Sequence, residues 1–186
     1  GLPGTAYTSG EFFELEANQL FAASWSFVGF AHQLANVGDV QPLTVAGKPV
    51  FLVRSEADKI RAFHNVCRHR NLKLIGQAGH CDALITCPYH RWSYDFGGQL
   101  RLAPYFGGGK SGLPDGFDLA NHGLYEIPCH TFHDWVFVNL DGHAESFDVF
   151  FEPLKRQLVG FEPEEFEVVA TLEFGEVSTN WKLLME

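Results

Sequence analysis

The stretch CRHRNLKLIGQAGHCDALITCPYHRW, residues 67–92, holds two mixed pairs of metal-binding side chains. The pairs are Cys67-x-His69 and Cys87-x-x-His90, and seventeen residues separate His69 from Cys87. Two cysteines and two histidines at this density predict either a tetrahedral Zn²⁺ site or an iron–sulfur cluster. Zinc fingers group like with like, as C-x₂₋₄-C and H-x₃₋₅-H. A mixed pair on each of two loops instead favours a two-iron cluster, because each loop can offer its Cys to one iron and its His to the other.

The ligand set also predicts the charge of such a cluster. If Cys67 and Cys87 hold one iron while His69 and His90 hold the second, two ferric ions, two sulfides and two thiolates sum to zero in the oxidised state. Four thiolates would leave a charge of about −2 on the same core. An added electron therefore meets less negative charge, and the histidines raise the reduction potential.

Length and composition favour a globular fold. The chain has 186 residues, 46% of them hydrophobic, enough for one good-sized domain or for one domain plus part of another. Four cysteines are too few for a disulfide scaffold, so we expect a reduced, cytoplasmic protein. No run of 18 apolar residues and no signal peptide is present. The chain starts with Gly and stops inside NWKLLME, so we expect a fragment.

Charge is unevenly placed along the chain. The net charge is −10, yet residues 48–110 carry 10 basic and 4 acidic groups, whereas residues 111–186 carry 3 basic and 15 acidic groups. A basic centre inside an acidic chain argues against general nucleic-acid binding and for a local negative group near the Cys/His pairs.

The hydrophobic pattern predicts a mainly β chain with helices at both ends. Thr8 or Ser9 can cap a helix that ends before Trp25, with Phe12, Phe13, Leu15, Leu20 and Phe21 on its apolar side. An antiparallel meander is expected over residues 25–30, 42–46, 49–55 and 60–66. Further expected elements are a hairpin at 92–102, strands at 124–132 and 134–140, a helix at 146–161 broken near Pro153, and a strand at 165–174.

The Cys/His pattern resembles a known family. C-x-H-x₁₇-C-x₂-H, with CPYH at residues 87–90, is similar to the pattern of Rieske [2Fe–2S] proteins. The high-potential branch has a cysteine disulfide and a cluster-bonding serine where this chain has Leu72, Tyr89 and Trp92, so it resembles the low-potential branch. Four segments resemble, in order and spacing, the large (α) subunit of Rieske non-haem iron oxygenases, a similarity that begins at about Tyr7: AFHNVCRHR, CPYHRWSYDFGGQL, WVFVNLD and NWKLLME.

This resemblance implies a mainly β fold, a Rieske domain of stacked antiparallel sheets with flanking helices, followed by the start of an α+β catalytic domain. It implies an N-terminal helix and lead-in strand at 1–40, the Rieske domain at 41–145, and a linker helix with the start of the truncated catalytic domain at 146–186. The cofactor-binding and metal-binding residues are then Cys67, His69, Cys87 and His90. No catalytic residue is expected, because the mononuclear Fe(II) of the family would have its ligands beyond Glu186.

The resemblance further implies an oxygenase subunit that takes electrons from a reductase or ferredoxin. It would pass them to the mononuclear Fe(II) for O₂-dependent aromatic dihydroxylation, monooxygenation or demethylation of a small organic substrate. A homotrimer or an α/β hetero-oligomer in the cytoplasm is implied, without nucleic acid or membrane as a partner. The alternatives are a stand-alone Rieske-type electron carrier and a zinc-binding structural domain. The substrate stays open among aromatic acids, aromatic hydrocarbons and quaternary ammonium compounds.

Two positions depart from the family pattern. Rieske proteins usually have Gly where this chain has Asn71 and Arg91, which predicts an altered loop backbone or altered hydrogen bonds at the cluster. The remaining polar and aromatic residues receive simpler interpretations. Cys81 and Cys129 are expected as buried small hydrophobes, His130 and His133 as unrelated to metal, and Trp92 and Tyr94 as core of the second loop. Arg68, Arg70 and Arg91 are either solvated loop charges or groups that stabilise the reduced cluster or meet an acidic electron donor.

Overall fold

The computed structural model describes residues 1–108, 112–161, 166, 169–170, 172, 175 and 177–185. The strands are β1 Trp25–Phe30, β2 Asp39–Val45, β3 Lys48–Glu56, β4 Lys59–His64, β5 Gly79–His80, β6 Ile85–Thr86, β7 Ser93–Tyr94, β8 Leu100–Leu102, β9 Glu126–Ile127, β10 Cys129–Phe132 and β11 Trp135–Asn139. The helices are α1 Thr5–Thr8, α2 Gly10–Glu16, the π-helical η1 Ala17–Phe21, the 3₁₀ turns η2 Ala31–Gln33 and η3 Leu119–His122, α3 Phe147–Gln157 and α4 Trp181–Met185. No helix within this part of the chain is long and apolar enough to cross a membrane.

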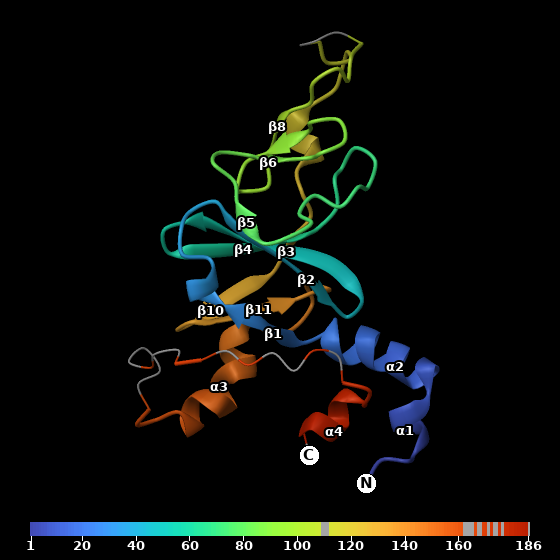
Figure 1. Ribbon diagram of the computed structural model, residues 1–186, viewed down its shortest axis with the longest axis vertical. Helices are drawn as coiled ribbons and strands as arrows, with labels where there is room; N and C mark the ends of the chain where they lie inside the picture. The colour runs from blue at the N-terminus through green and yellow to red at the C-terminus, as the bar shows by residue number, and fades with distance from the viewer. Residues whose placement is uncertain are drawn as a thin grey trace.

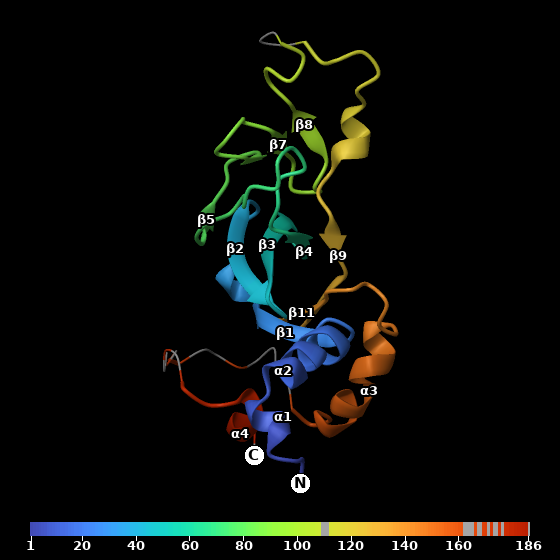
Figure 2. The ribbon, with the colours of Figure 1, turned by 90° about the vertical axis from the view of Figure 1, so that its right-hand side faces the viewer.

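The described strands form three antiparallel sheets stacked along the long axis of the molecule (Figures 1 and 2). The middle sheet has the order β5-β2-β3-β4-β9, and the sheet β1-β11-β10 lies below it in Figure 1. The small sheet β6-β7-β8 lies above, and the helices α1, α2, α3 and α4 lie at the opposite end. The expected mainly β class with stacked antiparallel sheets is confirmed.

The first strand corrects the expected meander. β2, β3 and β4 do follow one another in a meander, but β1 pairs with β11, so that Trp25 lies opposite Asn139 and Phe30 opposite Trp135. An alternating pattern identifies a strand with a buried face, but it carries no information on a pairing partner more than 100 residues away.

Two hydrophobic cores lie on the two faces of the middle sheet. In β3, Val50 and Leu52 face the core shared with the lower sheet, whereas Phe51 and Val53 face the core beneath the Cys/His loops. All four side chains are at most 2% exposed. Because both faces of β3 are covered, its sequence PVFLV reads as a continuous apolar run instead of an alternating one.

Pro128 divides the segment that was expected as one strand over 124–132. β9 belongs to the middle sheet and pairs with β4, whereas β10 belongs to the lower sheet and pairs with β11. Proline has no N–H to donate to a ladder, so it marks the point at which the chain leaves one sheet for the other. Its carbonyl still accepts a hydrogen bond from the Asn139 N–H at 3.0 Å.

The expected N-terminal helix is confirmed, with Ser9 as its cap. The Phe12 N–H donates to the Ser9 hydroxyl at 3.3 Å, and the helix continues through η1 to Phe21. The short helix α1 before it was not predicted, because four residues are too few to show a helical period. Part of the apolar side faces outward, since Phe13, Leu15 and Leu20 are 44–51% exposed.

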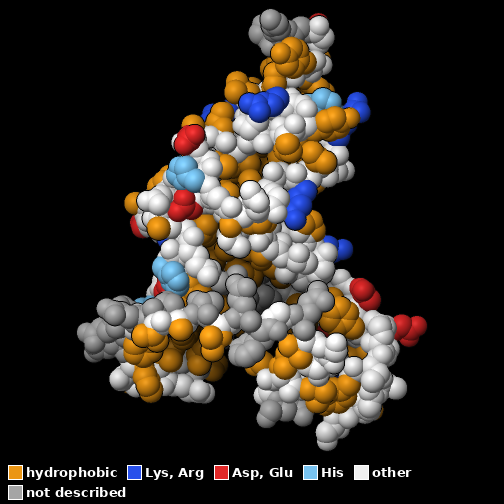
Figure 3. All heavy atoms as spheres, viewed as in Figure 1, with side chains coloured by type: hydrophobic (Ala, Val, Ile, Leu, Met, Phe, Trp, Pro, Cys, Tyr) orange, Lys and Arg blue, Asp and Glu red, His pale blue; other side chains and the backbone are white. Residues whose placement is uncertain are grey.

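Lys and Arg side chains gather in the upper half of the face shown in Figure 3, toward the Cys/His loops. The two lobes at the bottom of that face show no blue side chains among the described residues. This distribution agrees with the basic centre that the sequence places at residues 48–110.

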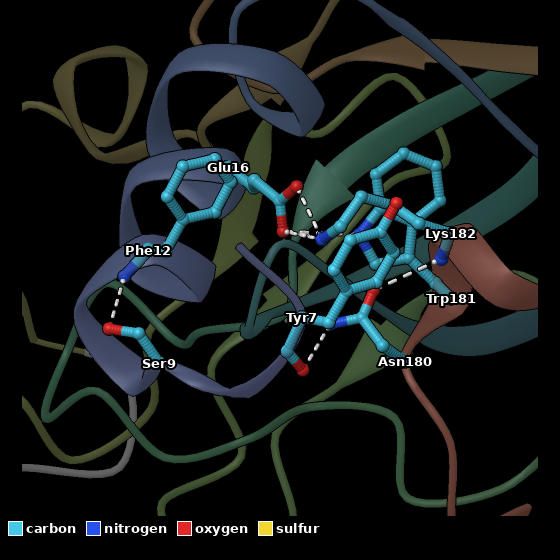
Figure 4. A network of polar contacts seen from close by, with 7 residues as sticks. All are labelled: Tyr7, Ser9, Phe12, Glu16, Asn180, Trp181 and Lys182. Carbon is cyan, nitrogen blue, oxygen red and sulfur yellow. Dashed lines mark hydrogen bonds and ion pairs between the residues drawn. The ribbon is translucent and has the colours of Figure 1, made fainter. Parts of the chain in front are cut away.

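The two ends of the described chain are joined by a buried ion pair (Figure 4). The Lys182 ammonium donates to both carboxylate oxygens of Glu16, at 2.7 and 2.9 Å, and the Trp181 indole N–H donates to the same carboxylate at 3.2 Å. The Asn180 side chain also donates to the Tyr7 carbonyl at 3.2 Å. The helix α4 is therefore held against α1 and α2.

The helix α3 is continuous from Phe147 to Gln157 through Pro153, so the break predicted near Pro153 is wrong. Pro153 is exposed, and the helix is held by Phe147 and Phe151, which are buried against Phe137. On a solvent-facing side the carbonyl that loses its donor can bond to water, and packing on the other side offsets the cost. The strand expected at 165–174 falls largely on residues outside the described part of the chain and stays a prediction.

Candidate metal centre

The first Cys/His loop, Cys67–Leu72, follows β4 and is closed by two backbone hydrogen bonds. The Asn71 N–H donates to the Cys67 carbonyl at 2.9 Å, and the Cys67 N–H donates to the Leu72 carbonyl at 2.8 Å. Asn71 has φ of 55°, in the left-handed region. His69 therefore lies on a closed turn that begins at a cysteine.

The second loop, Cys87–Trp92, lies between β6 and β7 and repeats this turn. The Arg91 N–H donates to the Cys87 carbonyl at 3.1 Å, and the Cys87 N–H donates to the Trp92 carbonyl at 2.8 Å. Arg91 has φ of 63°. Each loop can be counted from its cysteine as position one. In both loops the N–H of the fifth position donates to the carbonyl of the first, and the N–H of the first donates to the carbonyl of the sixth. The fifth position has a left-handed backbone in both.

The left-handed fifth position gives a physical reason for the glycine that the family pattern has where this chain has Asn71 and Arg91. Glycine adopts this conformation without steric cost, whereas Arg strains the backbone and Asn tolerates it better than most residues. Both loops nevertheless keep their closing hydrogen bonds with Asn71 and Arg91 in place. The effect of Asn71 and Arg91 on the loop backbone or on the hydrogen bonds of the cluster stays a prediction.

The two cysteines of the loops point inward. Cys67 and Cys87 are 1% and 2% exposed, and their thiols are neighbours. Burial raises the pKa of the Cys67 thiol, and the Cys87 thiol raises it further. Two buried, adjacent thiols fit a site in which a bound metal supplies the charge that thiolates require.

The two histidines of the loops lie together at the surface end of the site. The rings of His69 and His90 are 4.7 Å apart between centroids, and both side chains are half-buried. They line a pocket of about 440 Å³ with Tyr89, Tyr105 and Phe106. The Nδ1 atom of His90 is buried and has no hydrogen-bond partner among the residues the structure describes. A buried ring nitrogen without a partner is costly, and a metal ligand is one role that explains it.

These residues form two pairs, thiols inside and imidazoles outside. No group of three or more Cys, His, Asp or Glu side chains in the described part of the chain surrounds a single point. A single tetrahedral zinc ion needs such a group, whereas a two-iron cluster with Cys₂ on one iron and His₂ on the other needs one pair at each end. The arrangement therefore fits a mixed-ligand two-iron cluster better than zinc.

Tyr94 and Trp92 confirm the expectation of core residues beneath the second loop, at 0% and 2% exposure. Trp92 also lies parallel to the His69 ring, with 4.8 Å between centroids. The Tyr94 hydroxyl lies 3.4 Å from the Cys67 sulfur and accepts a hydrogen bond from the Arg68 N–H at 3.1 Å. Since that N–H occupies the phenol oxygen, the phenol proton is free to point at the sulfur.

Asn65 is a positioning residue that sequence reasoning missed. Its side chain is 1% exposed and makes three hydrogen bonds to the chain that follows the first loop. The amide group donates to the Ile75 carbonyl at 2.8 Å, and its oxygen accepts from the N–H groups of Leu74 and Ile75 at 3.0 and 2.9 Å. The signal in the sequence was the polar pair His64-Asn65 within the otherwise apolar segment 62–67.

The other candidate residues lie away from the two loops. Cys81 and Cys129 are free, half-buried thiols packed against the upper and lower cores, so the expectation of full burial is met only in part. His130 stacks on Phe147 at 4.0 Å, in the lower part of the molecule. Arg68 is fixed to the protein, because its guanidinium donates to the Gly123 carbonyl at 2.6 Å and lies 3.9 Å above the Tyr125 ring.

Comparison with known proteins agrees with this geometry. Residues 24–113 match the family described as Rieske [2Fe-2S] domain. The chain is 34% identical to the glycine betaine monooxygenase oxygenase subunit of Chromohalobacter salexigens, over all of this chain and 40% of that protein. It is 32% identical to the 2-aminobenzenesulfonate 2,3-dioxygenase subunit alpha of an Alcaligenes species, over 97% of this chain and 45% of that one.

The fold is also similar to solved structures. The quaternary ammonium Rieske monooxygenase CntA in complex with L-carnitine superposes with a TM-score of 0.79 at 29% identity, covering 98% of this chain and 51% of that one. The chain thus spans less than half the length of the two curated relatives. It carries a Rieske [2Fe–2S] domain and is homologous to the oxygenase (α) subunits of Rieske oxygenases.

Proposed function

We propose that this chain is the electron-transfer part of an oxygenase subunit, with Cys67, His69, Cys87 and His90 as the ligands of its [2Fe–2S] cluster. The observation that carries the proposal is the pair of matching loops, which places both thiols inside and both imidazoles at the surface. An electron could then enter or leave through the half-buried imidazoles, which line the surface pocket. The cluster supplies one-electron storage, and the protein residues fix its ligands and its surroundings.

The experiment that tests the ligand set is metal and sulfide analysis of single cysteine variants. Cys67→Ser and Cys87→Ser should lose iron and acid-labile sulfide, whereas Cys81→Ser and Cys129→Ser should keep both. Reduction of the unaltered protein should give the EPR signal of a nitrogen-ligated two-iron cluster. Zinc without iron or sulfide would refute the proposal.

We further propose that the whole protein uses these electrons for O₂-dependent oxidation of a small organic substrate. The support is similarity over the entire chain, including α1, α2 and α4 outside the Rieske match, to named monooxygenases and dioxygenases. The mononuclear Fe(II) would belong to a catalytic domain outside residues 1–186. The division into 1–40, 41–145 and 146–186 stays part of the proposal, as do the cytoplasmic location, a reductase or ferredoxin donor, and a homotrimer or α/β hetero-oligomer.

The names of the relatives decide which substrates to assay first. Quaternary ammonium compounds such as glycine betaine and carnitine come first, and aromatic sulfonates second. The competing function is a stand-alone electron carrier. Product formation by the intact protein, with Fe(II) and an electron donor, separates the two: the oxygenase gives substrate-dependent O₂ consumption and an oxidised product, and the carrier gives neither.

A further inference from the structure

Each histidine of the two loops is followed directly by an arginine. Arg70 follows His69, Arg91 follows His90, and both arginines line the 440 Å³ pocket into which the two imidazoles project. Arg68 is not among the residues that line this pocket. Its guanidinium is fixed on the Gly123 carbonyl and the Tyr125 ring.

The charges of these two arginines are not neutralised within the described structure. Neither Arg70 nor Arg91 makes an ion pair or a side-chain hydrogen bond with another described residue, and no carboxylate lines the pocket. A positive potential therefore exists at the imidazole end of the site, in a chain of net charge −10.

The position of Arg91 is costly for the backbone. Its φ of 63° lies in the left-handed region, where glycine would satisfy the same closing hydrogen bonds without strain. Asn71 occupies the equivalent position of the first loop with φ of 55° and carries no charge. The chain thus offers two equivalent strained positions, only one of which bears a charge beside the histidines.

We propose that Arg70 and Arg91 favour reduction of the cluster by placing two fixed positive charges at its imidazole end. The inference rests on the proposed function, because it requires the cluster on Cys67, His69, Cys87 and His90. With two thiolates and two neutral imidazoles, the oxidised cluster is neutral, and one electron from the donor makes it −1 with no proton taken up. Positive charges nearby stabilise the product of that step more than the reactant.

The test is an equilibrium redox titration of the iron-loaded intact protein, followed by EPR and visible circular dichroism of the cluster. Arg70→Met and Arg91→Met should each lower the equilibrium constant for reduction about threefold to tenfold, which is about 30 to 60 mV at 59 mV per tenfold for one electron. Arg91→Lys should keep most of the wild-type value. The differences should shrink from low salt to 1 M salt, because these side chains are exposed.

Two glycine variants separate charge from backbone strain. Arg91→Gly should lower the equilibrium constant as Arg91→Met does, while the melting temperature stays equal or rises by up to about 3 °C. Asn71→Gly relaxes the matching position without changing charge, and Arg156→Met removes a charge from α3 at the other end of the molecule; both should leave the equilibrium constant unchanged.

Equal constants for wild type and Arg91→Met, an equal loss in Arg91→Lys, or a difference that persists in 1 M salt would each overturn the inference. Absence of iron and sulfide from the wild-type protein would instead refute the proposed function, before any titration is made.

Discussion

The hydroxyl of Tyr94 makes the sharpest prediction about the cluster environment. It lies 3.4 Å from the Cys67 sulfur, and its oxygen already accepts the Arg68 N–H. Burial raises the pKa of the Tyr94 phenol well above its usual range, so the hydroxyl keeps its proton at neutral pH. A hydrogen bond donated to a thiolate stabilises negative charge, and therefore the reduced cluster, so Tyr94→Phe should lower the reduction potential.

The size of the effect follows from the strength of such a bond. A hydrogen bond to a charged group contributes about 1.5–3 kcal/mol, but the sulfur is a thiolate in both redox states. The reduction potential therefore depends only on how much stronger this hydrogen bond is in the reduced cluster than in the oxidised one. We take this difference as about 1 kcal/mol. At 59 mV per tenfold, this corresponds to a decrease of about 40 mV for a one-electron couple.

The assay is the same redox titration, with unfolding measured in parallel. Tyr94→Phe also leaves the Arg68 N–H without its partner, so a loss of stability of about 1–3 kcal/mol should accompany the change in potential. Ser93→Ala is the matched control: its buried hydroxyl bonds to the Thr86 hydroxyl and the Arg91 carbonyl and does not touch a sulfur. An unchanged potential in Tyr94→Phe, or an equal decrease in Ser93→Ala, would refute the reasoning.

Three further changes test other parts of the structure. Asn65→Ala removes three buried hydrogen bonds and should lower the free energy of unfolding, measured with urea, by about 3 kcal/mol. A decrease below about 1 kcal/mol would show that other contacts hold the loop. If a cluster assembles in His69→Cys, its reduction potential should be lower than in the wild type, because a thiolate adds negative charge. A higher reduction potential in the titration would contradict histidine ligation. The hydrogen bond from Lys182 lowers the pKa of Glu16, so the contact between helices stabilises the fold above pH 4.5 and is lost as pH falls through the depressed pKa. Trp181 fluorescence should report that transition, and Lys182→Met should abolish it; a transition that persists in the variant would assign it to another group.

Local signals in the sequence were sufficient for most elements, and they indicated four candidate ligands whose role stays a proposal. Ser9 as a helix cap and the strands around Phe51 and Phe63 follow from short-range patterns. The meeting of His69 and His90 was predicted from the longer C-x-H-x₁₇-C-x₂-H spacing. Short-range signals act over a few residues, and capping groups and the hydrophobic period can both be read within that range.

The features that were missed depend on distant parts of the chain. The pairing of β1 with β11 and the change of sheet at Pro128 are decided by which surfaces meet in the folded protein. The helix survives Pro153 because its buried face packs on Phe137. At the site, the shared hydrogen-bond pattern of the two loops and the contact between Tyr94 and Cys67 arise from backbone angles and packing that residue types alone do not specify.

The ion pair between Glu16 and Lys182 sets an order of events during protein synthesis. The two residues are 166 positions apart, so at roughly 5–20 residues per second Glu16 waits about 8 to 30 s before its partner is made. A β domain of this size can fold within that time. The Glu16 carboxylate of α2 therefore stays without Lys182 during this interval, so the contact that joins the two ends forms last.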